Sequence, residues 1–294
     1  MKKGITIIAV VLCAATVYAK GSGSTIPNTD LVYTGPGGVE SFTENVADAL
    51  TNYPWSDVPI PPGTVLIKIT NTGNTCKIQP ADKGSQDTIA LIIDGGPSKI
   101  QMDFGQAKGA GTIPYMYING NAGKVLFKGL AEDIGRVVVD NENDSRGIHL
   151  QNISKGKTGG GFKDIITAGK LHRAQSNHAG FGGPDENDIG IMMIGKETNK
   201  GQIKAGSKSG VANILICKSV NTNKFATFQE AYDTCVASNA VQTGVEMTGL
   251  MKINTKAIGP AVLAVDVDKK YKSNQVGKRI KITDPVVGLG NVTE

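Results

Sequence analysis

Two acidic turns carry the residues in this sequence that are best suited to chemistry. The first turn, 140–144, places carboxylates at alternate positions, and the second follows the Gly-Gly-Pro run at 182–184. Closely spaced oxygen ligands on a turn suit a hard cation such as Ca²⁺, although neither turn has the glycine at position six of an EF-hand loop. We therefore expect either calcium sites or plain solvated turns, and no other cofactor. The candidate calcium ligands are Asp140, Glu142, Asp144, Asp185 and Asp188.

Three histidines and one pair of nearby arginine and aspartate residues are the remaining candidates for acid–base chemistry. The first histidine lies in an apolar run, where strand alternation points it outward. The other two lie in the Gly- and Asn-rich stretch 169–183, which we expect to be a long loop, and their spacing of six matches no conventional zinc motif. Arg146 beside Asp144 is the nearest approach to an acid–base grouping, with a plain ion pair as the alternative. The histidines are His149, His172 and His178.

Residues 1–19 have the layout of an export signal. Two lysines precede an apolar core at 5–12, and Val-Tyr-Ala at 17–19 suits signal peptidase. The apolar core is too short to cross a hydrocarbon layer about 30 Å thick. A type IV prepilin leader and a lipoprotein leader are the alternatives, but the first would need an acidic residue and the second a smaller residue at Leu12. We expect a secreted protein, extracellular or on the cell surface, with the periplasm as the other compartment and no membrane segment after cleavage.

The composition indicates a turn-dense β protein. The whole chain carries 31 basic and 26 acidic residues, a net charge of +5, and loss of the two leader lysines makes it +3. This charge is too small to indicate a nucleic-acid partner. Glycine contributes 38 of 294 residues and aromatic residues only 5%. Such a composition is typical of β folds rich in turns.

Three cysteines remain after leader cleavage. An odd number permits at most one disulfide within the chain, and in an exported protein Cys217 and Cys235 are the natural pair. Closing that short loop would contribute about 3 kcal/mol in the chain-entropy account. The pair would staple a helix predicted over 225–235. Cys76 is left over and is expected to be buried, with pairing between molecules as the alternative.

The stretch 41–69 predicts the first elements of the main domain. Apolar residues at helical spacing indicate a short amphipathic helix, with Ser41 or Thr43 as N-cap and Glu44 completing a capping box. Pro54 should end the helix, the proline-rich segment 59–64 should form a turn, and 65–69 should form a strand. The apolar side of the helix comprises Phe42, Val46, Ala49 and Leu50.

Aliphatic residues recur at intervals in the twenties, which is typical of a solenoid whose successive coils superpose equivalent strands. Such stacked strands lie about 4.8 Å apart, so in-register residues pack in columns. A helix at the first coil would protect the open end of the stack. The expected columns are Val65, Ile89, Ile113 and Val137, then Ile78, Ile100, Val125 and Ile148, and finally Ile191 with Ile214.

The helix followed by a Pro-Pro-Gly-Thr turn at 61–64 and a strand resembles the opening of the pectin-lyase-like right-handed parallel β-helix superfamily. The phrases 146–154, 188–195 and 212–218 are similar to that superfamily too. The resemblance covers residues 41–220 and implies an all-β fold, a right-handed parallel β-helix or solenoid with an N-terminal capping helix. A β-sandwich or jelly roll with long loops is the alternative. The superfamily includes lyases, hydrolases, tailspikes and adhesins, so it does not select a function.

The segments on either side of the solenoid-like region 41–243 differ from it in composition. Residues 20–40 are rich in Gly, Ser and Pro and predict a flexible arm with one short strand at 31–33. The same arm could instead pair with an exposed strand edge of a neighbouring subunit. Residues 244–294 predict a closing cap or small β module. Its expected strands are 245–253, 261–268 and 279–283, followed by a loose tail at 286–290.

These features predict an exported, non-catalytic structural or surface protein. It would be a filament or adhesive subunit that self-associates by β-strand contacts, with a polysaccharide or a cell surface as a further partner. The competing hypothesis is a secreted polysaccharide lyase or hydrolase. The resemblance implies calcium-binding acids with a catalytic base, or paired carboxylates, and neither set maps onto this sequence. The single Trp and few Tyr also offer little aromatic surface for sugars. A monomeric binding protein is the third hypothesis.

Overall fold

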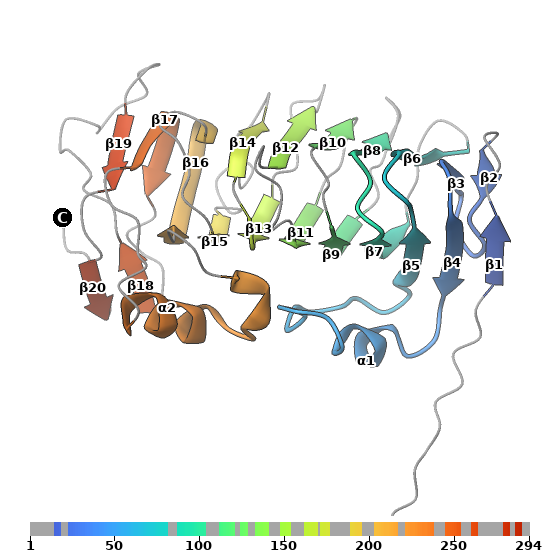
Figure 1. Cartoon of the computed structure of the whole chain (residues 1–294), viewed down its shortest axis with the longest axis horizontal. Coiled ribbons are helices and arrows are strands. Elements are labelled where there is room, and N and C mark those ends of the chain that lie inside the picture. The colour runs from blue at the N-terminus through green and yellow to red at the C-terminus, as the bar shows by residue number, and fades with distance from the viewer. Residues whose placement is uncertain are drawn as a thin grey trace, which may run out of the picture.

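A computed structural model describes the chain in segments separated by short gaps. The described backbone comprises residues 15–18, 23–81, 87–103, 112–120, 124–128, 133–140, 148–153, 162–169, 171–176, 189–195, 203–216, 221–237, 245–253, 260–263, 279–282 and 286–289. This part of the chain is all-β, as predicted. Its strands form two mixed sheets, which lie above and below one another in Figure 1 and are called here the upper and the lower sheet.

The lower sheet is parallel in its middle and antiparallel at both ends. Strands β5 to β18 pair in parallel in the order below, whereas β1–β4, β4–β5 and β18–β20 are antiparallel pairs. In spatial order the strands are β1 (Ala15–Tyr18), β4 (Gly38–Phe42), β5 (Val65–Thr70), β7 (Thr88–Asp94), β9 (Thr112–Asn119), β11 (Asp133–Asp140), β13 (Phe162–Thr167), β15 (Ile189–Ile194), β16 (Ile203–Ile216), β18 (Pro260–Leu263) and β20 (Val286–Leu289).

The upper sheet has the same plan. Strands β6 to β17 pair in parallel, and β2–β3, β3–β6 and β17–β19 are antiparallel. The chain therefore alternates between the two sheets, and the long strand β16 pairs in both. In spatial order the strands are β2 (Ser24–Thr25), β3 (Leu31–Thr34), β6 (Thr75–Pro80), β8 (Lys99–Asp103), β10 (Lys124–Lys128), β12 (Ile148–Ile153), β14 (Leu171–Ser176), β16, β17 (Val245–Ile253) and β19 (Arg279–Ile282).

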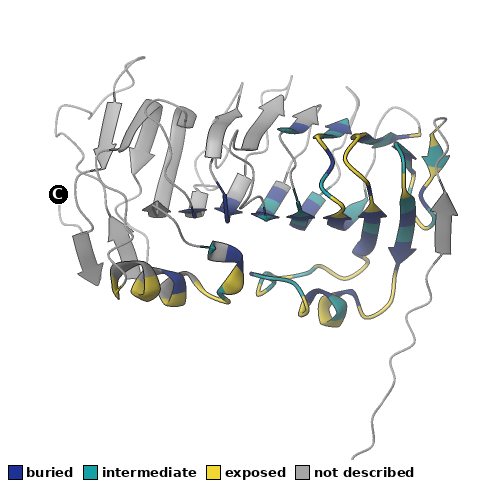
Figure 2. Cartoon of the chain, viewed as in Figure 1, coloured by how far each residue is buried: buried dark blue, intermediate teal, exposed yellow. Residues whose placement is uncertain are grey.

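The lower sheet is buried on both faces in the described region. A column of fully buried, apolar side chains runs along its inner face. Its outer face is covered by α1 (Val46–Leu50), by the segment around Trp55 and by α2 (Phe228–Ala237) (Figures 1 and 2). Helix α2 follows the 3-10 turn η1 (Thr222–Lys224). Burial on both faces explains why these strands read as continuous apolar runs. The inner column comprises Ile67, Leu91, Met116, Val137 and Ile165.

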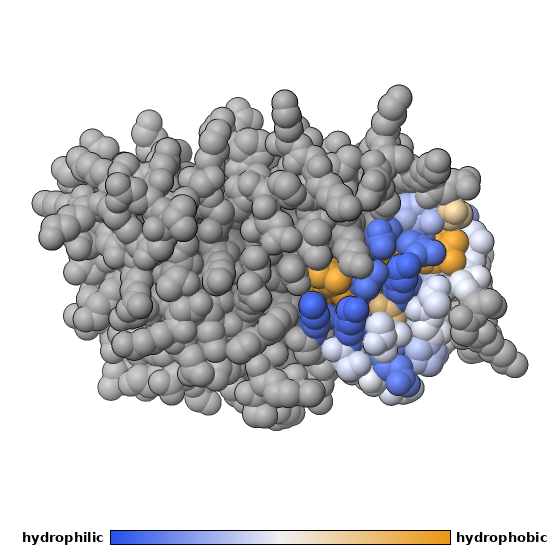
Figure 3. Space-filling model, turned by 90° about the horizontal axis from the view of Figure 1, so that it is seen from above, coloured by the Kyte–Doolittle hydropathy of each residue, from blue (hydrophilic) through white to orange (hydrophobic). Residues whose placement is uncertain are grey.

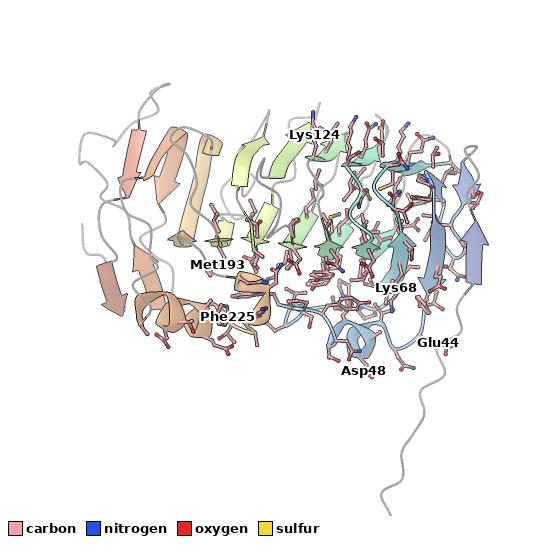
Figure 4. All side chains as sticks on the ribbon, in the orientation of Figure 1. Glu44, Asp48, Lys68, Lys124, Met193 and Phe225 are labelled. Carbon is pink, nitrogen blue, oxygen red and sulfur yellow. The ribbon has the colours of Figure 1, made fainter. Side chains whose placement is uncertain are left out.

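Helix α1 has the predicted apolar and polar sides but not the predicted start. Phe42, Val46 and Leu50 are buried, whereas Glu44 and Asp48 point into solvent (Figure 4). The capping box is wrong: Asn45 is the N-cap, in the left-handed region with φ of 51° and no side-chain cap, while Ser41 and Phe42 belong to β4. Helix α1 also lies against the lower sheet and not across its end (Figure 1), since β1 to β4 occupy that end.

The predicted columns are correct at two steps. Val65 pairs with Ile89, and Ile100 is paired with Val125. The other predicted steps are displaced because coil lengths vary and because the register shifts between Thr88 and Ala90. The observed pairs are Ile113 with Ile134, Met116 with Val137, Ile78 with Met102, Val125 with Leu150, and Ile191 with Asn213.

Three segments expected to be irregular contain strands. The predicted flexible arm contains β2, β3 and the start of β4, of which only 31–33 was predicted, and its Ile26, Leu31, Tyr33 and Val39 are fully buried. The predicted loop 169–183 contains β14, and the predicted loose tail contains β20. Strands β17 and β19 agree with the predicted runs 245–253 and 279–283. Strand β18 covers only the start of the predicted run 261–268, and 264–268 lies outside the described residues. Among the described residues, no helix is long and apolar enough to span a membrane.

Candidate functional site: the end strands of the two sheets

Strand β4 is the first strand of the lower sheet that is packed into the body of the protein. It pairs with β5 over five residue pairs, from Gly38 with Thr70 to Phe42 with Leu66. Val39 and Ser41 are fully buried, and the Ser41 hydroxyl donates a hydrogen bond of 2.8 Å to the Pro27 carbonyl. These contacts hold β4 in place independently of its other edge.

The other edge of β4 receives β1. The pairing is antiparallel and covers four residue pairs, from Ala15 with Ser41 to Tyr18 with Gly38. All four residues of β1 lie within the predicted export signal. Among the described strands, β1 alone pairs with this edge of β4, and leader cleavage would remove all of β1.

A buried polar cluster fixes the turn that connects β3 with β4. The Tyr33 hydroxyl donates to the Pro36 carbonyl at 2.7 Å. The Asn71 amide donates to the Tyr33 hydroxyl at 3.1 Å and to the Pro36 carbonyl at 3.2 Å. Burial of the phenol raises the pKa of Tyr33 to about 12, because the charged phenolate would lose its hydration. The cluster ties β3 of the upper sheet and the turn before β4 to the end of β5 in the lower sheet.

Both sheets also end in an edge strand on the C-terminal side. Strand β19 pairs with β17 and strand β20 pairs with β18, each over four antiparallel residue pairs. The edge of β19 that faces away from β17 pairs with none of the described strands, and the same holds for the edge of β20 that faces away from β18. A strand edge of this kind is a template for pairing with another chain.

The two sheets have equal numbers of strands when β1 is left out. Each sheet then contains ten of the described strands, with β16 counted in both. The first strands are β4 and β2, and the last strands are β20 and β19. The first strands of both sheets lie at one end of the stack, and the last strands of both sheets lie at the other end (Figure 1). A second copy of the chain could therefore continue both sheets.

The sequence interpretation missed the most buried charged group in the described part of the chain. Arg136 and Asp164 are paired in register on the outer face of the lower sheet, beneath the segment around Trp55. Arg136 Nε donates to an Asp164 carboxylate oxygen at 2.9 Å, Nη1 donates to the Trp55 carbonyl at 2.7 Å, and Nη1 also pairs with Asp57. The signal that could have found them is a charge inside an apolar strand. Since Nε and Nη1 donate to this chain's own groups, the cluster is suited to anchoring the 51–64 connection.

The outer face of the upper sheet is hydrophilic and rich in lysine. The described part of this face is mainly hydrophilic, with a few hydrophobic patches (Figure 3). Lys77, Lys99 and Lys124 alternate with inward apolar residues, and Lys124 points away from the sheet (Figure 4). The Lys124 position is paired in register with His149, and His149 with Arg173. Asp103 is an acidic residue on the same face, paired in register with Lys128. The charged positions of this face are therefore mainly basic in the described strands.

One of the five candidate calcium ligands lies in the described part of the chain. Asp140 is the last residue of β11, is half-buried and is paired in register with Asn119. The pKa of Tyr117 is raised to about 12, first by burial and then by the nearby carboxylates of Asp140 and Asp94. Among the described residues, no three His, Cys, Asp or Glu side chains could hold a metal ion together. Glu142, Asp144, Arg146, His178, Asp185 and Asp188 lie outside the described residues.

The predicted disulfide also falls outside the described side chains. Cys217 lies outside the described residues, and Cys235 lies in α2, with no side-chain description. His172 lies in β14, in a segment predicted to be loop. Cys76 is a free thiol, fully buried as predicted, and its burial raises the thiol pKa from 9.0 to about 12.

We expect Cys76 to resist alkylation in the folded protein. The thiolate is the reactive form, and burial both shields it and disfavours it at pH 8. Because the pKa in the folded state exceeds the unfolded value, the unfolded chain loses this proton first, and stability should fall as pH rises from 9 towards 12. Mass spectrometry after iodoacetamide treatment should detect modified Cys76 only after denaturation. Rapid native modification at pH 8 would contradict the burial.

Comparison with known proteins adds no assignment to this geometry: no family model, no curated protein and no solved structure matches the chain.

Proposed function

We propose that the chain is a right-handed parallel β-helix that acts as an exported, non-catalytic structural subunit and polymerises head to tail. The alternation of the chain between two parallel sheets supports the β-helix. The features of residues 1–19 support export. The end strands support polymerisation, because an edge left open at each end of a sheet invites strand addition.

The equal strand numbers of the two sheets carry this proposal. Strand β20 of one copy would add to β4 of the next, and β19 would add to β2. Such a contact joins two different surfaces, and repeated contacts of this type give an open filament unless the rotation closes a ring. Each junction would satisfy backbone groups that an isolated subunit leaves to water.

Removal of β20 should abolish polymers of the processed protein. A chain ending at Pro285 lacks β20, whereas a chain ending at Gly290 keeps it and serves as the matched control. Both are examined by electron microscopy and sedimentation over a range of concentrations. We expect filaments from the control and from the unshortened protein, and none from the chain ending at Pro285. Equal filament formation by both shortened chains would refute the role of β20.

A second role, attachment to an acidic polysaccharide or cell surface, is favoured by the lysines of the upper sheet. The outer face of this sheet carries Lys77, Lys99 and Lys124, and the stack would align further basic positions along its axis. A linear polyanion lying along the stack would meet these charges in succession. Binding of this kind weakens as salt screens the charges.

Reversal of the three lysines should remove this binding. The variant carries Lys77→Glu, Lys99→Glu and Lys124→Glu and is compared with the parent on immobilised alginate. We expect the parent to be retained at low salt and the triple variant to flow through. Lys224→Glu changes an exposed lysine of η1 and should leave retention unchanged. Retention of the triple variant equal to that of the parent would exclude this face as the binding surface.

A further inference from the structure

We propose that β1 is a removable cap: while residues 1–19 are attached, β1 occupies the edge of β4 that a second copy needs, and leader cleavage opens it. This inference rests on the proposed head-to-tail assembly. It adds how the assembly is controlled and which strand edge the assembly uses. The partner is a second copy of this chain, which contributes β20.

The pairing pattern supports β1 as a substitute for an incoming strand. Strand β1 covers Gly38 to Ser41 of β4, a stretch of four residues, and β20 is itself a strand of four residues. Strand β20 has the sequence Val-Val-Gly-Leu, in which the β-branched residues favour an extended chain. Both strands are terminal strands of the lower sheet, one at each end, so β20 of a second copy would take the place that β1 leaves.

The strand numbers give a second argument. With β1 present the lower sheet has eleven described strands and the upper sheet ten, and the surplus strand is β20 at the last end, because β1 lies level with β2 at the first end (Figure 1). Without β1 each sheet has ten. Without β1, the upper sheet projects by one strand, β2, at the first end, and the lower sheet projects by one strand, β20, at the last end. These two steps are complementary, so β20 of one copy can meet β4 of the next while β19 meets β2. With β1 in place the first end has no step to receive β20.

The edge of β4 that pairs with β1 should stay folded after cleavage. Strand β4 is held by five residue pairs with β5, and its Val39 and Ser41 side chains are fully buried. The turn before β4 is fixed by the hydrogen bonds among Tyr33, Pro36 and Asn71. Cleavage therefore exposes a formed strand edge, which lowers the ordering cost of docking another strand.

Two full-length chains that differ only in the position of an inserted protease site test this proposal. In the first, the site follows Ala19, so cutting removes the apolar leader and β1. In the second, the site follows Leu12, so cutting removes the apolar leader but keeps β1. Both proteins are cut, purified from the released peptide, and followed by light scattering and electron microscopy at equal concentration.

We expect filaments after the cut at Ala19, and at least a tenfold slower growth after the cut at Leu12. A synthetic peptide of residues 13–19 should slow growth of the first product, because it can reoccupy β4. Equal growth of both products would overturn the cap and leave the head-to-tail proposal standing. Absence of filaments from both products would overturn the proposed assembly, and the cap with it.

Discussion

Replacement of Arg136 by alanine is expected to lower the free energy of unfolding by about 3–5 kcal/mol, the usual cost of removing one partner of a buried ion pair. Only 8% of the Arg136 side chain and 9% of the Asp164 side chain are exposed. The substitution removes the cation beside the buried Asp164 carboxylate and the Nη1 donor to the Trp55 carbonyl. It also removes the guanidinium group, whose carbon lies 5.9 Å from the centre of the Trp55 ring.

Urea unfolding followed by circular dichroism measures this loss. Lys99→Ala, a substitution of a half-buried lysine on the upper sheet, should change stability by no more than about 0.5 kcal/mol. Asp164→Ala should cost far less in the Arg136→Ala background than alone, because the two residues act as a unit. A cost below about 1 kcal/mol for Arg136→Ala would mean that the cluster does not anchor the 51–64 connection.

Replacement of Gly37 by alanine should also destabilise the protein strongly, by about 2–5 kcal/mol. Gly37 has a φ of +92°, a region that costs other residues about 1–2 kcal/mol. A Cβ at this position would also overlap the backbone carbonyl of Thr70, and overpacking of this kind adds about 1–3 kcal/mol. The substitution would strain the turn that sets β4 beside β5.

Gly63 provides the matched control for Gly37. It also has a positive φ, +79°, but a Cβ added there would meet nothing within 4 Å. Gly63→Ala should therefore show the conformational cost without the steric cost. Thermal unfolding of both variants separates the two terms, and equal midpoints would contradict the close approach of Gly37 to Thr70.

The class of fold could be predicted from the sequence, but most strand registers could not. Val65 with Ile89 was predicted correctly because the first coils differ little in length. Farther along, the lower strands are buried on both faces, so they lack the alternation that fixes register. Ile191 shows the consequence: it pairs with Asn213, one residue from the predicted Ile214.

The candidate site was predicted only in outline. The idea of an arm near an exposed edge followed from the composition of 20–40, yet the strands β2, β3 and β4 in this segment pair within their own chain. Strand β20 lies in the predicted tail because four residues containing a glycine carry little β signal. Strand β1 was concealed by the export-signal pattern. Strand pairing joins residues far apart in sequence, and local patterns do not encode it.

The axial repeat of filaments formed by the processed protein tests the central claim most directly. Ten strands per subunit in each sheet, at about 4.8 Å per strand, give a repeat of about 48 Å along the filament. Cryo-electron microscopy of these filaments should find that repeat, with both sheets continuous from one subunit to the next. Closed oligomers, or filaments in which the sheets of neighbouring subunits do not join end to end, would contradict it.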